Sequence, residues 1–254
     1  MTTVIPIPAL RDNYIWLIRR GNVAAIVDPG EAKPVLKILK AESLRPAAIL
    51  ITHHHWDHVN GIQEVLHHYP VPVYGPLYES IPGRTQALGE GDEVDLQELG
   101  LRLHVLDVPG HTAGAIAYYG ESLLFSGDTL FTAGCGRLFE GTAEEMYTSL
   151  AKFVRLDPET QLYCGHEYTL SNLRFATRME PGNSSLQARL REVSALRDHG
   201  RPSVPATLAV ERETNPFLRC DLPSVRAAAE QYAGKPLPTG AEVFAVVRAW
   251  KDVF

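Results

Sequence analysis

Metal-binding side chains are concentrated in one short stretch, a His-x-His-x-Asp-His pattern that begins at His53 and follows an apolar segment. His53 and His55 are two residues apart, so in extended backbone their side chains point the same way; His54 points oppositely and is expected to be structural. Asp57 and His58 follow after the chain has turned and can address a second position. Imidazole and carboxylate groups are ligands that zinc, iron and manganese accept. Because such polar groups are costly to bury unsatisfied, the pattern predicts a metal site.

Three further candidate ligands occupy comparable positions, each after a short apolar strand and each preceded by glycine: His111, Asp128 and His166. The glycine allows the backbone to bend and direct the side chain toward a common centre. The remaining histidines are expected to be ordinary hydrogen-bonded residues, namely His67, His68, His104 and His199.

The elements that must position these groups can be predicted from the hydrophobic pattern. Strands are expected at 23–27, 47–51, 101–105, 115–119, 123–125 and 161–164, the fourth and fifth forming a hairpin. Helices are expected at 31–43, 61–69, 142–156, 184–199, 224–232 and 241–253, the third opening with a capping box. The hydrophobic pattern changes near residues 166–175, from one typical of short strands to one typical of long helices.

Composition excludes several classes of protein. The chain has 254 residues, 45% hydrophobic and 21% charged, which is typical of a globular protein. A net charge of −6 and a pI of about 5.9 argue against binding to nucleic acid. No apolar run reaches the roughly 18 residues of a membrane span, and no signal peptide is visible. Three widely spaced cysteines without a CxxC pair favour a reducing compartment, so we expect a cytoplasmic protein without a membrane partner.

Several motifs carry a family resemblance. The segments THHHWDH, PGHT, SGDTLF and CGHEYT, in this order, resemble the metallo-β-lactamase superfamily. IPALRDNYIWL, DPG at Asp28–Gly30, AGCGRLFEGTAEEMY, CGHEYTLSNLRFA and TNPFLR are similar to the glyoxalase II (hydroxyacylglutathione hydrolase) family, and the similarity covers essentially the whole chain. The resemblance implies an α/β fold: an αββα metallo-β-lactamase sandwich as catalytic domain over residues 1–166, and a smaller C-terminal helical, substrate-binding domain over residues 167–254.

The resemblance also implies a ligand set for two divalent metal ions, with zinc expected first and iron or manganese as alternatives. One ion would be held by His53, His55 and His111, the other by Asp57, His58 and His166, with Asp128 bridging both. The catalytic residues would be Asp57 and Asp128, acting with a hydroxide that bridges the metals. Asp57 is expected to orient that nucleophile and accept its proton.

Glutathione contacts are implied at Arg137, Tyr168, Arg248 and Lys251. The last two are three residues apart in a helical segment, so they share a face. One position departs from the family pattern: some members have a tyrosine where this chain has Phe139, so a hydroxyl contact is lost there.

The chemistry that follows is thioester hydrolysis. Two metals that share a water lower its pKa to about 7, and the resulting hydroxide attacks a carbonyl. A thioester expels a thiolate whose acid has a pKa of about 8.5, so no general acid is required. The substrate implied by the family is S-(2-hydroxyacyl)glutathione, above all S-D-lactoylglutathione, cleaved to D-lactate and glutathione in the second step of glutathione-dependent methylglyoxal detoxification.

Alternative functions remain open at this stage. A glutathione persulfide dioxygenase of the same superfamily would use a single iron, whereas the chain offers ligands for a second metal. A metal-dependent phosphodiesterase or nuclease would need a basic groove, which the acidic pI opposes. A metal-binding structural protein would close its coordination shells with protein ligands. We expect a monomer.

Overall fold

The computed structural model describes residues 2–254. Packing divides the chain into two compact units, the first formed by Met1–Asp107 and Thr112–Gly127 and the second by Val108–His111 and Asp128–Phe254. The expected division into a catalytic domain over residues 1–166 and a helical substrate-binding domain over residues 167–254 stays a prediction.

The first unit contains a six-stranded sheet with the order β1-β2-β3-β4-β5-β6. The pairs β1–β2 and β2–β3 are antiparallel, and the pairs from β3 to β6 are parallel. The strands are β1 Thr3–Ala9, β2 Asn13–Arg20, β3 Val23–Val27, β4 Arg45–Leu50, β5 Val73–Pro76 and β6 Gln86–Leu88. The expected strand at 47–51 is the buried β4, whose apolar residues on both faces fit a position inside the sheet.

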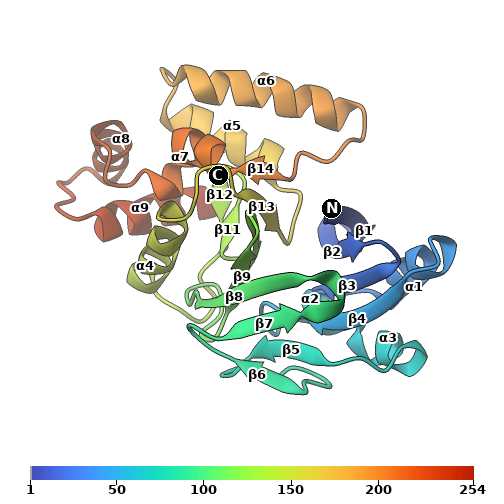
Figure 1. The fold of residues 1–254 in the computed structure, drawn as a ribbon. Coiled ribbons are helices and arrows are strands. Elements are labelled where there is room, and N and C mark those ends of the chain that lie inside the picture. The colour runs from blue at the N-terminus through green and yellow to red at the C-terminus, as the bar shows by residue number, and fades with distance from the viewer. Residues whose placement is uncertain (1) are drawn as a thin grey trace. The chain divides into compact units, whose positions relative to one another are not determined.

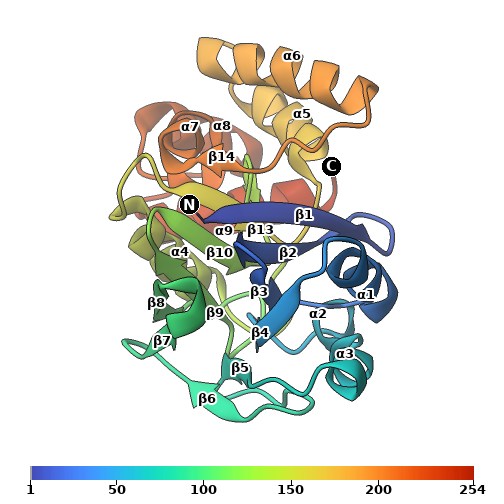
Figure 2. The same cartoon turned by 45° about the vertical axis from the view of Figure 1, so that its right-hand side comes forward.

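Helices lie in two of the three connections between the parallel strands. They are α1 Ala32–Ala41 between β3 and β4, and α2 Trp56–Val59 with α3 Ile62–His68 between β4 and β5. The apolar stripes of α1 and α3 pack on one face of the sheet, which Figure 2 shows from the side. Fully buried members of this core include Val35, Leu39, Ile62, Val65, Ile26 and Ile49. The expected helices at 31–43 and 61–69 are therefore confirmed.

The first unit also contains an antiparallel run of strands in the order β10-β9-β8-β7. They are β7 Glu93–Leu96, β8 Leu101–Asp107, β9 Ile116–Gly120 and β10 Leu123–Gly127, with a 3-10 turn at Gln97–Leu99. The expected hairpin is confirmed: β9 and β10 are joined by Glu121 and Ser122, whose φ values of 48° and 59° suit a two-residue hairpin turn. The Tyr118 hydroxyl donates to the Ile51 carbonyl at 2.8 Å and so ties β9 to the end of β4.

The second unit contains two small strand pairs and most of the helical sequence (Figure 1). Its strands are β11 Leu130–Phe131, β12 Gly134–Cys135, β13 Gln161–Cys164 and β14 Ala206–Thr207. Its helices are α4 Ala143–Val154, α5 Thr169–Met179, α6 Ser184–Asp198, α7 Leu208–Thr214, α8 Pro223–Ala233 and α9 Gly240–Asp252, with a 3-10 turn at Pro216–Leu218. The capping box of α4 is present, formed by Thr142 and Glu145. The sequence pattern predicts four of these helices and misses α5 and α7.

A buried carboxylate organises the β11–β12 hairpin. Glu211 of α7 accepts the Ala133 amide at 2.7 Å and the Asn215 side-chain amide at 2.9 Å. Asn215 in turn donates to the carbonyls of Phe131 and Gly134 at 3.0 and 2.9 Å. The chain that leads from Asp128 toward Arg137 is therefore fastened to a helix. Over residues 2–254, none of the helices is both long and apolar enough to cross a membrane.

Candidate metal centre

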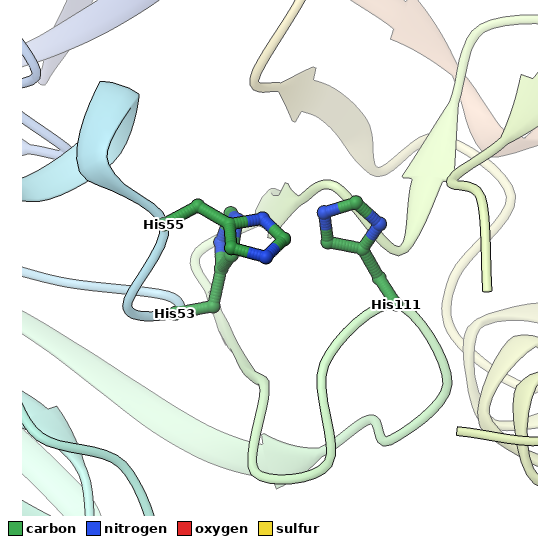
Figure 3. A group of neighbouring side chains, drawn as sticks. All are labelled: His53, His55 and His111. Atoms are coloured by element: carbon green, nitrogen blue, oxygen red, sulfur yellow. The ribbon is translucent and has the colours of Figure 1, made fainter. Parts of the chain in front are cut away.

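The first group of candidate ligands lies where β4 ends and the chain enters α2. His53 and His58 are each 1% exposed, and their ring centroids are 4.1 Å apart. The rings of His53 and His55 are also neighbours, with centroids 4.8 Å apart. Figure 3 shows both rings on this loop and His111 on a loop of its own. His53, His55 and His58 thus lie close together on the loop after β4.

Asp28, at the end of β3, holds two of these histidines. Its Oδ2 lies 3.0 Å from Nδ1 of His58 and accepts the Thr52 hydroxyl at 2.7 Å, while its Oδ1 accepts the Thr52 amide at 2.8 Å. The Thr52 oxygen lies 3.0 Å from Nδ1 of His53. Because the Thr52 proton is directed at Asp28, Nδ1 of His53 is the donor in that contact. The carboxylate therefore places the proton of both imidazoles on Nδ1.

This proton placement suits metal binding. A neutral imidazole protonated on Nδ1 carries its lone pair on Nε2, and metal-binding histidines usually donate their second nitrogen to a carboxylate, carbonyl or similar acceptor. Asp28, His53 and His58 also each offer a ligand atom within 4.8 Å of one another. The donor chemistry and its hydrogen-bonded support fit a divalent metal.

Asp57 is positioned by a residue just after the turn between β1 and β2. The side-chain amide of Asn13, the first residue of β2, donates to Asp57 Oδ2 at 2.9 Å. Asp57 Oδ2 also lies 3.7 Å from Nε2 of His58. A close backbone approach supports this loop, since a Cβ on Gly30 would lie 1.7 Å from the Asp57 carbonyl oxygen. Only glycine fits there.

The second unit brings together the other three candidates. Asp128 Oδ2 lies 3.1 Å from Nε2 of His166 and 3.5 Å from Nε2 of His111. Nδ1 of His111 donates to the Arg137 carbonyl at 2.8 Å, so its lone pair also resides on Nε2. All three residues are buried. One carboxylate oxygen thus stands between two imidazole nitrogens, an arrangement that suits a shared metal position.

Glycines shape this second group as expected at two of three positions. Gly110 and Gly127, which precede His111 and Asp128, have positive φ values of 143° and 51°. A further glycine was not singled out by the sequence: a Cβ on Gly136 would lie 1.9 Å from the Asp128 carbonyl oxygen and 2.9 Å from His111 Nδ1. Only glycine therefore fits at position 136, where the backbone passes beside both proposed ligands.

The residues expected to contact substrate have distinct surroundings in the second unit. The ring of Tyr168 stacks on that of His166, with centroids 4.7 Å apart and planes at 6°. The Arg137 side chain is 65% exposed and its Nε lies 3.6 Å from Asp252 Oδ1. Phe139, at the position that departs from the family pattern, is 64% exposed, and its ring forms a T-shaped pair with that of His111, with centroids 5.3 Å apart.

Arg248 is more buried than its expected role suggests. It is 6% exposed, and its Nη1 donates to the Cys135 carbonyl at 2.8 Å while Nη2 lies 3.1 Å from Asp252 Oδ1. The guanidinium therefore fastens α9 to the β11–β12 hairpin. Lys251 is half-buried, and its pKa is lowered by burial and by the nearby charges of Arg248 and Arg137. Asp252 pairs with Arg248 and Arg137 and opposes the lowering at Lys251, but three cations outnumber this one carboxylate, which favours an anionic ligand.

Cysteine chemistry is not part of this centre. Cys135, Cys164 and Cys220 are buried, and residues 2–254 contain no disulfide. Burial raises the pKa of Cys135 to about 11 and that of Cys164 to about 12. Neither supplies a thiolate nucleophile near neutral pH.

The supporting residues were the ones the sequence did not reveal as functional. Glu79 lies outside every motif, whereas Asn13, Thr52 and Asp28 lie within motifs of the family resemblance that assign them no role of their own. The left-handed φ of 51° at Asp28, unusual for a non-glycine residue, is visible only in the structure.

Comparison with known proteins agrees with this geometry. A family model described as "Metallo-beta-lactamase superfamily" matches residues 9–166, and one described as "Hydroxyacylglutathione hydrolase C-terminus" matches residues 167–254. The hydroxyacylglutathione hydrolase of Alkalilimnicola ehrlichii is 56% identical over 254 residues and 99% of each chain. That of Nitrosomonas europaea is 50% identical, over 100% of this chain and 97% of its own.

A solved structure supports the same conclusion. The crystal structure of TTHA1623 in a di-iron-bound form has a TM-score of 0.61 at 26% identity, over 84% of this chain and 100% of its own. The expected fold, a metallo-β-lactamase α/β fold with a helical C-terminal region, is confirmed by these matches. The chain belongs to the hydroxyacylglutathione hydrolase family of the metallo-β-lactamase superfamily.

Proposed function

We propose that this protein is a metal-dependent thioester hydrolase that cleaves S-(2-hydroxyacyl)glutathione, with S-D-lactoylglutathione as its principal substrate. The products are then D-lactate and glutathione, and the reaction is the second step of methylglyoxal detoxification. The observation that carries the proposal is the identity of 56% to a hydroxyacylglutathione hydrolase over 99% of both chains. That similarity includes the C-terminal helices, matched by a model specific to this family.

The proposed ligand set contains seven residues. His53, His55 and His111 would hold one divalent ion, and Asp57, His58 and His166 would hold the other. Asp128 would be the ligand that the two ions share. In support of this role, its Oδ2 lies 3.5 Å from Nε2 of His111 and 3.1 Å from Nε2 of His166, one imidazole from each set. The di-iron form of TTHA1623 supports a two-metal centre. We infer zinc as the ion, although the nitrogen and oxygen donors also accept iron or manganese.

When bound, the two ions acidify a shared water and stabilise negative charge on a carbonyl oxygen. The protein's own groups supply the orientation. Asn13 fixes the Asp57 carboxylate through Oδ2, so Asp57 can direct the attacking water and accept its proton. The hydrogen bonds of Asp28 hold His53 and His58 in one tautomer, which keeps the site ready without rearrangement.

The leaving group explains why no further acid is needed. A glutathione thiolate is a stable leaving group near neutral pH, because its conjugate acid has a pKa of about 8.5. Over residues 2–254 the cysteine thiols are buried and the metal-binding groups are histidines and aspartates, so the reaction depends on direct attack by water. The carboxylates of the glutathione moiety are assigned to Arg137, Arg248 and Lys251, and Tyr168 lines the same region.

Zinc-loaded protein tests the proposal directly. Incubation with S-D-lactoylglutathione should release one free thiol and one D-lactate per thioester, and metal-stripped protein should release neither. Oxygen uptake with glutathione persulfide would instead indicate the dioxygenase, and cleavage of a phosphodiester would indicate the nuclease class. Either result without thioester cleavage contradicts the proposal.

We further infer a monomer in the cytoplasm, in keeping with three cysteines outside any disulfide.

A further inference from the structure

Glu79 is a buried carboxylate outside the proposed ligand set. It lies in the loop after β5, and its side chain is 3% exposed. Oε2 lies 3.0 Å from Nδ1 of His54, while Oε1 accepts the Thr112 hydroxyl at 2.5 Å and the Gly114 amide at 3.2 Å. A carboxylate is costly to bury unless it is paired. The two hydrogen bonds satisfy Oε1, whereas Oε2 is buried without a hydrogen bond from residues 2–254 and faces Nδ1 of His54.

The partners of Glu79 are adjacent in sequence to three proposed ligands. His54 stands between His53 and His55, and Thr112 directly follows His111. Thr112 is fully buried, so its contact is shielded from competing water. One carboxylate therefore joins two loops that each carry ligands.

The loop that carries Glu79 is itself held firmly. Arg84 Nη1 donates to the Glu79 carbonyl at 2.7 Å and also bonds the Pro76 carbonyl. Ile81 packs in the hydrophobic core of the first unit. The fit to the neighbouring loop is close, since a Cβ on Gly114 would lie 2.7 Å from Glu79 Cγ. The carboxylate is thus a fixed point rather than a flexible surface group.

We propose that Glu79 is a positioning residue for the metal centre, acting through His54 and Thr112 to hold the two ligand-bearing loops in register. It is not a member of the proposed ligand set. The inference rests on the ligand set proposed above but not on the identity of the thioester. Positioning groups behind metal ligands typically change metal affinity by about 10- to 100-fold, and contacts one residue removed from the ligands belong at the lower end.

The test compares Glu79→Gln and His54→Ala with a matched exposed pair. Glu93 Oε1 lies 3.1 Å from Nδ1 of His104, and these two side chains are 44% and 51% exposed. Glu93→Gln and His104→Ala therefore remove the same chemistry from a surface. The probe is zinc, titrated against a competing chelator, and the melting temperature of the metal-free protein is measured in parallel. Thr112→Ser, which keeps the hydroxyl, and Thr112→Val, which removes it, provide a second pair should Glu79→Gln fail to fold.

If Glu79 positions the metal centre, zinc affinity should fall about 10-fold in Glu79→Gln, His54→Ala and Thr112→Val. Thr112→Ser and the surface variants should stay close to wild type. A lower melting temperature of the metal-free protein with unchanged zinc affinity would show a purely structural role and overturn the proposal. Wild-type protein that retains no zinc would overturn the ligand set as well. Failure to cleave the thioester by protein that does bind zinc would count against the proposed function alone.

Discussion

Nδ1 of His58 lies 3.0 Å from Oδ2 of Asp28, and the same oxygen accepts the Thr52 hydroxyl that supports His53. Asp28 therefore serves two histidines that the proposed ligand set assigns to different metal ions. It does so from a left-handed backbone conformation, with φ of 51°, that costs free energy for a residue other than glycine. Such a conformation persists where surrounding contacts over-determine it, as the three hydrogen bonds to this carboxylate do.

Replacing Asp28 with asparagine should weaken zinc binding by about 10- to 100-fold. The carboxylate accepts three donors: the Thr52 amide, the Thr52 hydroxyl and Nδ1 of His58. An asparagine has a single acceptor oxygen, so its NH2 group must face at least one of these donors. The measurement is chelator competition followed by metal analysis. Asp95→Asn, an exposed aspartate paired with Arg102 at 3.8 Å, is the control and should retain wild-type affinity.

Asp128→Ala should lower the zinc content from about two ions per chain and reduce thioester hydrolysis by more than the roughly 100-fold typical of supporting residues. The reason is its position between Nε2 of His111 and Nε2 of His166. Elemental analysis of protein purified without chelator gives the ratio, and thiol release gives the rate. Full activity with one ion per chain would contradict the two-metal assignment.

The sequence predicts the elements that carry regular hydrophobic periodicity. The strand at 23–27 and the helices α1, α4, α6, α8 and α9 follow directly from that periodicity and from the capping box at Thr142. The first strands were missed, because β1 and β2 consist of apolar residues mixed with Pro6, Pro8 and Arg19, and their pairing depends on a partner strand rather than on local pattern. Edge strands tolerate such prolines.

The candidate ligands were visible because His53, His55, Asp57 and His58 lie within six residues after an apolar segment, and a resemblance supplied their assignment to two metal ions. The residues that support the ligand-bearing loops through hydrogen bonds and close contacts could not be predicted in the same way. Asn13 and Glu79 reach Asp57 and His54 across 44 and 25 positions of sequence, and nothing local marks those contacts. Supporting hydrogen bonds depend on tertiary geometry, so they appear only once the strands are paired.

Glu211 should make the stability of the protein depend on pH. Burial raises its pKa from 4.5 to about 7, although hydrogen bonds from Ala133 and Asn215 oppose the rise. Because the folded state holds the proton more tightly than the unfolded state, this contribution is fully present below about pH 4.5 and is lost as pH rises through 7. Glu211→Gln keeps the acceptor oxygen and removes the charge. The melting temperature of Glu211→Gln relative to wild type should therefore increase between pH 5 and pH 8. Glu213→Gln, an exposed change on the same helix, should show no such trend.

Arg248→Ala should destabilise the protein as well as weaken substrate binding. Its buried guanidinium donates to the Cys135 carbonyl at 2.8 Å and pairs with Asp252 at 3.1 Å, so the substitution removes a link between α9 and the β11–β12 hairpin. Hydrogen bonds to charged groups contribute about 1.5–3 kcal/mol. A lower melting temperature in the absence of substrate is the expected result, and an unchanged one would mean that the guanidinium is held only weakly.

Lys251→Ala tests substrate binding more directly than Arg248→Ala, which is also expected to lower stability. The side chain is half-buried and carries a pKa lowered first by burial and then by Arg248 and Arg137, so an anionic partner is favourable at this position. The contact with a glutathione carboxylate is the same before and during thioester cleavage, so its loss should raise KM while kcat stays unchanged. Loss of a charge-assisted hydrogen bond should raise KM by about 10-fold or more. Because the Lys251 side chain is partly exposed, we expect a rise near 10-fold. Zinc content should not change.

Added salt provides an independent check on Lys251. Screening weakens attraction between partly exposed charges, so the KM of wild type should rise with salt more steeply than that of Lys251→Ala. Lys235→Ala removes an exposed lysine of the same unit and should leave both KM and its salt dependence unchanged. If the KM of Lys251→Ala equals that of wild type on S-D-lactoylglutathione at low salt, the lysine does not bind the glutathione moiety. Its proximity to Arg248 and Arg137 would then reflect packing of α9, where its ammonium lies 5.7 Å from the ring of Phe175.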